Sequence, residues 1–241
     1  MNFISYKSII DSPSIVFLKK EVEYFHPLME RNKWIGVYDE PENTIEKYIQ
    51  DSFDFYLKDT LGTPVGFEWW IQIFTDDDSS IPFHTSHDES KRINEGKMSY
   101  PLSSTITYLT GSSSPTIIAN TRNGNYLEEL HEFPPTEVIF SVPSEGKFVT
   151  CDPRYIRGVH PNQNKGRVTL CYDVWHYKPT GLDRVGILSE PFPCRFYKPK
   201  ERPPVTWLGK TKDCTSNLHD KMFTFNYPTI YREGETWKVI Q

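Results

Sequence analysis

The chain has 241 residues, 15% of them aromatic, and carries 19 prolines against 13 glycines. This composition disfavours a helical bundle and favours one domain of strands joined by stiff turns, because aromatic residues suit strands and proline breaks helix interiors. The formal net charge of −5 and the absence of a long basic run disfavour a groove binder of nucleic acid, which needs clustered Lys and Arg.

Two helices are predicted in the N-terminal quarter, where apolar residues recur at spacings of three and four. The first covers residues 11–31, with Ser12 as its cap and a proline in its first turn. The second covers residues 44–61, and Asn43 with Glu46 has the pattern of a capping box. Both apolar stripes are interpreted as faces that pack on the core of the domain.

From residue 65 onward the pattern changes to short β-like runs separated by Gly, Pro, Ser and Asn turns. Two tryptophans in the first run, Trp69 and Trp70, are assigned to the core and to the sheet edge. The expected strands cover 67–74, 103–109, 116–119, 137–142, 148–150 and 167–175. Their number predicts a mainly β sandwich of the jelly-roll type, with the two helices packed on it.

We expect a single domain over residues 1–241, with a helical part (1–64), a β core (65–178) and a proline-rich extension (179–241). The extension lacks the apolar mass for a core of its own, so we expect it to wrap the same domain. The four cysteines include no Cys-x-x-Cys pair, which indicates free thiols. No signal peptide or membrane span is evident, so a cytoplasmic or nuclear location is expected.

The densest group of potential metal ligands lies in residues 83–89, Phe-His-Thr-Ser-His-Asp-Glu, directly after an apolar run. Two imidazoles and two carboxylates within six residues have the composition of a metal site, although a polar segment of this kind is more often a solvated turn. If the strand continues, side chains alternate in direction. Each face then offers one His and one carboxylate, either His84 with Asp88 or His87 with Glu89.

A second informative stretch places His160 at the end of one run and Arg167 at the start of the next. In an iron site built from two His and one carboxylate, an early strand supplies one His with the carboxylate and a late strand supplies the second His. A nearby Arg then holds the far carboxylate of an oxo-acid through its planar fork of N–H donors. The stretch is therefore compatible with such a site.

The order of several blocks along residues 66–175 resembles a branch of the 2-oxoglutarate and Fe(II) dependent oxygenases. These blocks are 66–72, His84 with Asp88 and Glu89, 101–109 with 115–116, 157–160, Arg167 with Thr169, and Trp175. The resemblance implies a double-stranded β-helix with Fe(II) at one mouth and 2-oxoglutarate beside it. It implies a dioxygenase that oxidises a substrate C–H bond and releases succinate and carbon dioxide.

The chain departs from the metal motif of that family at two positions. The proximal motif reads His-x-Asp and matches His84, but Ser86 stands where the carboxylate should be. The distal motif reads His-Gly-Val, and the corresponding triplet begins with Arg157. Arg157 lies ten residues before Arg167, which is the spacing the family leaves between its distal His and its co-substrate Arg, whereas His160 lies seven before it.

Three interpretations stay open. In the first, the ligands have shifted, as a strand bulge allows, and the chain hydroxylates an unknown substrate. Its Fe(II) ligands are His84, Asp88 and His160, and its 2-oxoglutarate-binding residues are Arg167, Thr169 and Tyr108. In the second, the carboxylate position is vacant, as in iron halogenases. In the third, the metal is lost and the chain is a ligand-binding module in which Arg157 and Arg167 hold an anion.

A zinc hydrolase is an alternative from outside this family, with His84, His87 and His160 as ligands and Asp88 or Glu89 as the base. A spacing of three between the first two histidines suits a helix better than the expected strand end, which disfavours it. The expected partner is a small-molecule co-substrate. Nothing in the sequence identifies the substrate, because recognition loops vary freely in this fold.

Overall fold

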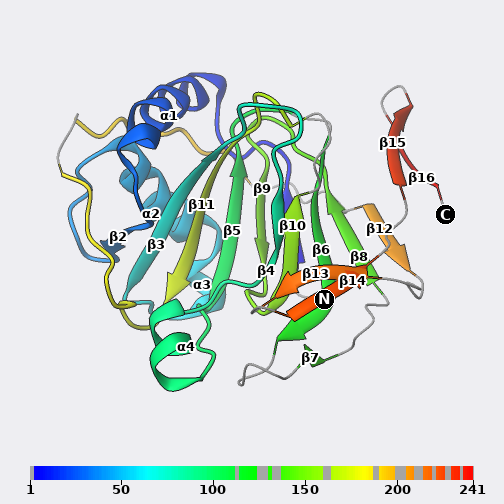
Figure 1. Cartoon of the computed structure of the whole chain (residues 1–241). Coiled ribbons are helices and arrows are strands. Elements are labelled where there is room, and N and C mark those ends of the chain that lie inside the picture. The colour runs from blue at the N-terminus through cyan, green and yellow to red at the C-terminus, as the bar shows by residue number, and fades with distance from the viewer. Residues whose placement is uncertain are drawn as a thin grey trace.

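In a computed structural model, the chain forms two antiparallel sheets that face each other, with helices on the outer surface of one sheet (Figure 1). The structure describes residues 3–111, 114–123, 130–131, 137–159, 164–186 and 190–198, and the backbone of further strands between 205 and 240. In these parts of the chain, no helix has the length and apolar character needed to cross a membrane.

The major sheet has six strands in the order β1-β9-β5-β11-β3-β2, and every neighbouring pair is antiparallel. Its strands are β1 (Phe3–Tyr6), β9 (Phe148–Cys151), β5 (Ser103–Tyr108), β11 (Val168–Trp175), β3 (Gly66–Ile73) and β2 (Lys33–Gly36). The long strand β11 lies between β5 and β3, so both of its edges are covered.

The minor sheet has the order β12-β8-β6-β10-β4. Its strands are β12 (Val205–Leu208), β8 (Glu137–Ser141), β6 (Thr116–Asn123), β10 (Tyr155–Val159) and β4 (Ile81–His84), and β7 (Leu130–His131) pairs with β6. Two hairpins follow, β13 (Cys214–Leu218) with β14 (Lys221–Phe225) and β15 (Thr229–Glu233) with β16 (Thr236–Ile240). The predicted fold class, a mainly β double-stranded β-helix with N-terminal helices, is confirmed.

The helices are α1 (Ser12–Phe25), a 3-10 turn η1 (His26–Leu28), α2 (Thr44–Tyr56), α3 (Lys58–Leu61) and α4 (Glu89–Glu95). Figure 1 shows α1 and α2 on the outer side of the major sheet, away from the minor sheet. Leu18 of α1 and Ile49 of α2 share one buried cluster with Trp69 and Leu170 of the sheet. This confirms that both helical stripes pack on the core.

The strand period of two divides β11 into two different faces. Leu170, Tyr172 and Val174 belong to the cluster under the helices, whereas Cys171 packs with β5 residues on the opposite face. Alternation places Thr169 and Asp173 on this second face as well. We call the space between the two sheets the interior; the polar residues of β11 point into it.

Three local predictions were wrong. Asp11, not Ser12, caps α1, and its Oδ1 accepts the Ser14 N–H at 2.9 Å. The first helix ends at Phe25 rather than residue 31, because Pro27 has no N–H to continue the ladder. Asn43 does cap α2, but the reciprocal bond of a capping box is absent there, since Glu46 accepts from the Glu42 N–H.

The remaining differences concern the end of the second helix and the positions of the strands. The second predicted helix breaks after Tyr56, where Leu57 leaves the helical region with φ of −122°. Strands β1, β2, β4 and β10 fall outside the predicted runs, and β12 shows that pairing continues past residue 175. The thiols of Cys151, Cys171 and Cys194 are free, as predicted for them.

We expect Tyr48→Phe to destabilise the protein, because the buried Tyr48 hydroxyl of α2 lies 2.7 Å from Thr107 Oγ1 of β5. Removing one partner of a buried hydrogen bond leaves the other unsatisfied and costs about 1–2 kcal/mol. Urea unfolding followed by circular dichroism measures the change. Tyr24→Phe on the exposed side of α1 is the matched control, and equal effects of the two variants would contradict the role of this bond.

Candidate functional site

The site is centred where β4 ends beside β10. In the antiparallel register, Arg157 of β10 lies directly opposite His84 of β4 and opposite Ile118 of β6. Directly opposite residues point to the same face of a sheet, so Arg157 and His84 are side by side. Ser86 follows β4, and its Oγ accepts a hydrogen bond from Arg157 Nη2. The structure therefore brings together residues 84, 86 and 157, which are the three motif positions.

Arg157 is a buried cation that lacks a full set of partners. Its side chain is 4% exposed, and Nη1 has no hydrogen-bond partner. Its bond to Ser86 joins it to a neutral hydroxyl, and in the described residues it forms no ion pair. The carboxylate of Asp173 lies close enough for Arg157 to lower its pKa, but the two form no direct ion pair in the described residues. Burying a charge with no directly bound counter-charge is costly, so this environment favours an anion next to Arg157.

His84 is held as a neutral imidazole. Its Nδ1 lies 2.9 Å from the carbonyl of Pro82, which only accepts, so Nδ1 carries the proton and Nε2 keeps a lone pair. Burial, and next the charge of Arg157, lower the pKa of His84 to about 4. The ring is therefore uncharged at neutral pH.

The predicted ligand Asp88 has another role. The strand ends at His84, so the expected alternation does not extend to Asp88, which instead caps α4. Its Oδ1 accepts the Lys91 N–H at 3.0 Å, and its Oδ2 accepts from the Tyr177 hydroxyl at 2.9 Å. Both carboxylate oxygens are thus in use within the protein.

The alternative pair His87 and Glu89 is joined in the structure, with Nε2 of the ring 2.8 Å from the carboxylate. Glu89 also accepts from the guanidinium of Arg92, and this bond, more than the ring, lowers the pKa of Glu89 to about 2. The pair is therefore a local ion-pair network at the start of α4. His160 lies outside the described residues, so the ligand sets that include it stay predictions.

The described residues at the site do not fit Fe(II). Across the described ranges, no group of three or more His, Cys, Asp or Glu side chains is placed to hold a metal ion. The donors that do converge are the imidazole of His84, the hydroxyl of Ser86 and the guanidinium of Arg157. Fe(II) prefers two imidazoles and a carboxylate, and a guanidinium has no lone pair to offer it.

Arg167 supplies a second buried cation. Its side chain is 1% exposed; Nη1 donates to the Ser114 carbonyl at 2.8 Å and Nη2 to Thr116 Oγ1 at 2.7 Å. Its guanidinium carbon lies 5.4 Å from the ring centroids of Phe74 and Tyr108. Its Nε has no partner, and within the described chain it forms no ion pair. Arg167 is thus oriented by neutral groups and keeps an unpaired donor.

The other two predicted co-substrate residues lie beside Arg167. The Tyr108 hydroxyl is 2.7 Å from Thr116 Oγ1, and Thr169 lies directly opposite Tyr108 in the sheet. Thr169 Oγ1 donates to Gln72 Oε1 at 3.0 Å. The structure therefore brings together Arg167, Thr169 and Tyr108, although the last two already have hydrogen-bond partners in the protein.

Both guanidinium groups face the same interior. Arg157 is opposite Ile118 on β6, and Thr116, which binds Arg167, lies two residues away on that strand, about 7 Å along it. Burial raises the pKa of the Cys171 thiol to about 12, while the charges of Arg157 and Arg167 oppose this rise. Both charges therefore lie close enough to the Cys171 thiol of β11 to affect it.

Asp173 is a site residue that sequence reasoning missed. It lies opposite Glu68 and Ser104 on the interior face and is 2% exposed, and its Oδ1 has no partner. Burial raises the pKa of Asp173, whereas the charge of Arg157 and, after it, the hydroxyls of Ser104 and Ser86 lower it. The signal in the sequence was a carboxylate within an otherwise apolar run, four residues after Thr169 and therefore on the same face of the strand.

Glu68, the neighbour of Asp173, has its own partners. Its Oε1 accepts from Asn32 at 2.7 Å, and its Oε2 accepts from the Trp175 indole N–H at 3.0 Å. Burial, followed by the charge of Asp173, raises the pKa of Glu68 to about 7. Glu68 is therefore a satisfied acceptor at the edge of the site, unlike Asp173.

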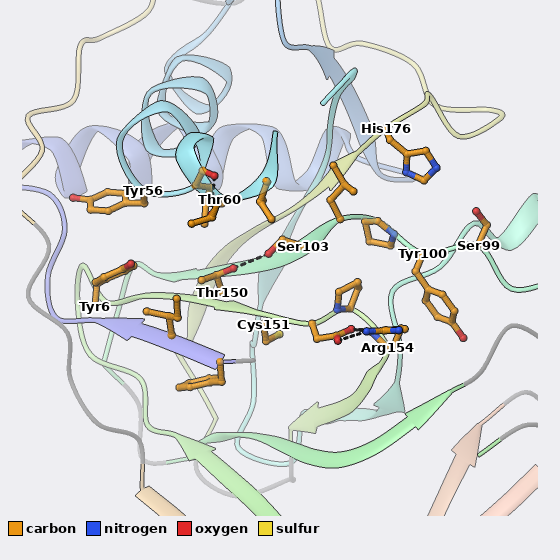
Figure 2. Close-up of a pocket in the computed structure, with 18 of the residues that line it drawn as sticks. Tyr6, Tyr56, Thr60, Ser99, Tyr100, Ser103, Thr150, Cys151, Arg154 and His176 are labelled. Carbon is orange, nitrogen blue, oxygen red and sulfur yellow. Dashed lines mark hydrogen bonds and ion pairs between the residues drawn. The ribbon is translucent and has the colours of Figure 1, made fainter. Parts of the chain in front are cut away.

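A separate groove of about 820 Å³ lies between the lower part of the major sheet and α3 (Figure 2). Two pairs of polar groups drawn there are hydrogen-bonded, Ser103 with Thr150 and Asp152 with Arg154. The Ser86 N–H donates to the carbonyl of Pro153 in the same turn. The groove is thus adjacent to the loop that carries Ser86, but its paired side chains give it no unsatisfied charge.

No protein-family model and no curated protein matches the chain. Similar solved structures include HygX from Streptomyces hygroscopicus with nickel and 2-oxoglutarate bound, at 13% identity over 76% of this chain and 84% of that chain, with a TM-score of 0.47. The structure of the epimerase SnoN in complex with Fe3+, alpha ketoglutarate and nogalamycin RO is 12% identical over 82% of this chain and 90% of that chain, with a TM-score of 0.47. EctD from S. alaskensis is 12% identical over 78% of this chain and 80% of that chain, with a TM-score of 0.45.

We expect the ring of His84 to titrate near pH 4 and to shift upward in Arg157→Gln, because removal of the cation makes the imidazolium less unfavourable. NMR titration of the ring protons measures both midpoints, and His84→Asn assigns the signal. His26→Asn serves as the control for the spectrum. An unchanged midpoint in Arg157→Gln would show that the two side chains do not interact as described.

Proposed function

We propose that the chain binds a small organic anion in the interior between its sheets, without an iron ion. The observation that carries the proposal is the pair of buried guanidinium groups, Arg157 and Arg167. Each keeps an unpaired N–H, and neither forms an ion pair in the part of the chain that the structure describes. An anion between them would offset the cost of burying two cations.

The chemistry of the two arginines favours a carboxylate ligand. A guanidinium presents N–H donors in a planar fork that matches the two oxygens of a carboxylate. Arg167 is fixed by Ser114 and Thr116, so it is preorganised to receive the ligand without losing much side-chain entropy. Arg157 offers a second donor at the other end, and the neutral His84 offers a lone pair on Nε2.

Iron has no role in this proposal because Arg157 lies across from His84. A permanent cation at that position repels a divalent cation, and the effect is strong in a buried site of low dielectric constant. Ser86 supplies a neutral hydroxyl in place of an anionic ligand. The net result is a site that attracts anions and disfavours metal ions.

The oxygenase interpretation remains a prediction of its own. It requires His160 to reach the point next to His84, and it requires Asp88 to give up its bonds to Lys91 and Tyr177. The two interpretations differ in one measurable respect, which is whether a metal ion is needed for binding of an anion.

We expect dicarboxylates such as succinate and 2-oxoglutarate to bind the protein in the presence of a strong chelator. Arg167→Ala and Arg157→Gln should each weaken binding roughly 10- to 100-fold, the value of a charge-assisted hydrogen bond. Isothermal titration calorimetry measures the affinities. Arg154→Ala is the matched control, because Arg154 is paired with Asp152 in the groove and should have no effect.

Binding that requires a metal ion would give a different result. If binding appears only after Fe(II) or Co(II) is added, and disappears in Asp88→Ala and His160→Ala, the anion-only proposal is wrong and the shifted ligand set is supported. Loss of binding in Arg154→Ala to the same degree as in Arg167→Ala would place the anion in the groove instead.

We also expect the double variant Ser86→Asp with Arg157→His to gain a metal site next to His84. It replaces a cation and a neutral group by an imidazole and a carboxylate, at positions that the register already brings together. Absorption spectra during Co(II) titration report the gain, with the wild type showing no band. The His84→Ala triple variant is the control.

Absence of Co(II) binding in a folded double variant would argue that residues 84, 86 and 157 do not converge. Tight Co(II) binding by the wild type, lost in His84→Ala, would refute the claim that Arg157 disfavours a metal ion.

A further inference from the structure

The interior contains a buried anion whose role the proposed function does not explain. Asp173 Oδ1 is unpaired although the residue is 2% exposed, and buried acceptors normally have a donor. The Ser86 hydroxyl lies between the two charged groups, since it accepts from Arg157 and, like the hydroxyl of Ser104 opposite Asp173 in the sheet, lowers the pKa of Asp173. Arg157 and Asp173 therefore flank Ser86, and each has one unused hydrogen-bonding atom.

Three charged side chains of the interior keep an unpaired atom: Arg157 Nη1, Arg167 Nε and Asp173 Oδ1. Two are cations and one is an anion, so their formal charges sum to one positive charge. A ligand that matches all three presents an anionic group to each guanidinium and a cationic donor to the carboxylate. Its own charges then sum to one negative charge, so the complex is neutral.

We infer that the ligand is an amino-dicarboxylate, with one carboxylate on Arg167 and an amino-acid head group on Arg157 and Asp173. This inference rests on the proposed function and specifies its ligand class. The head-group carboxylate accepts from Arg157, and its ammonium donates to Asp173. Both contacts are charge-assisted hydrogen bonds in a buried site, where such bonds are strongest.

Asp173 acts here as a specificity residue. A ligand that lacks the ammonium leaves Asp173 buried and unpaired next to the ligand's carboxylate, and like charges at close range are unfavourable. The same ligand still contacts both arginines. The difference between a ligand and its deaminated analogue therefore depends on Asp173, while the affinity for either depends on Arg167.

Calorimetry in chelator with matched ligand pairs tests this directly. The pairs are L-glutamate against glutarate and L-aspartate against succinate, which differ in the ammonium group and cover two chain lengths. For one pair at least, we expect the amino-dicarboxylate to bind roughly 10-fold tighter or more, the value of one charge-assisted bond. In Asp173→Asn this preference should fall to within about 3-fold.

The controls separate the inference from the proposed function. If the deaminated analogues bind as tightly as the amino compounds in the wild type, the inference is wrong while anion binding stands. If no dicarboxylate binds, or if binding is unchanged in Arg167→Ala, the proposed function itself fails. The comparison of ligands on the wild type needs no variant, so it tests the preference for an ammonium group even where Asp173→Asn does not fold. Glu68→Gln is the control, because Glu68 is a neighbouring buried carboxylate with its own hydrogen-bond partners.

Discussion

A guanidinium buried opposite an imidazole is the constraint on which the rest of the site depends. The charge of Arg157 cannot be neutralised by titration, because arginine does not lose its proton in proteins. It therefore acts on every titratable neighbour: it helps keep His84 neutral and opposes the upward pKa shifts of Asp173 and Cys171. The permanent charge of Arg157 therefore influences the protonation of several polar side chains in the interior.

The fold strengthens the electrostatic effect of this charge because it covers the interior on two sides. The helices α1 and α2 cover the outer face of the major sheet, so the alternate residues of β11 that face inward are shielded from water on that side. The minor sheet covers them on the other side. Exclusion of water lowers the local dielectric constant, which strengthens each electrostatic contact between the sheets.

The sequence predicted the features that depend on periodicity and composition. The fold class and the two helical stripes follow from patterns spread over many residues, whereas Arg167, Thr169 and Tyr108 were singled out together only through the resemblance to the oxygenases. The errors arose at single positions, where physical alternatives are nearly equal. Asp11 and Ser12 are both good caps, for example, and which one is used depends on where the first turn begins.

The candidate site was predictable only in part, because its key relations are between strands. That Arg157 lies opposite His84 follows from the register of β10 and β4, and the pairing of these two strands could not be predicted from the sequence. The cap at Asp88 depends on the chain turning into α4 directly after the strand. Asp173 could be assigned to the interior only when the helices had been placed on the other face of β11.

The two departures from the oxygenase motif are best understood together. A site with two neutral imidazoles, one carboxylate and Fe(II) has one net positive charge. The three motif positions alone, His84, Ser86 and Arg157 without a metal, also carry one net positive charge, before the neighbouring carboxylate of Asp173 is counted.

Either change alone would alter the field that an anionic ligand meets. Serine with the metal retained would leave two positive charges, and arginine beside a retained carboxylate, with the metal absent, would leave none. In the site that we propose, serine and arginine together keep one positive charge at the motif positions for an anion held by Arg167, without the open coordination positions that oxygen chemistry requires. There a tethered guanidinium supplies the positive charge that a metal ion would supply.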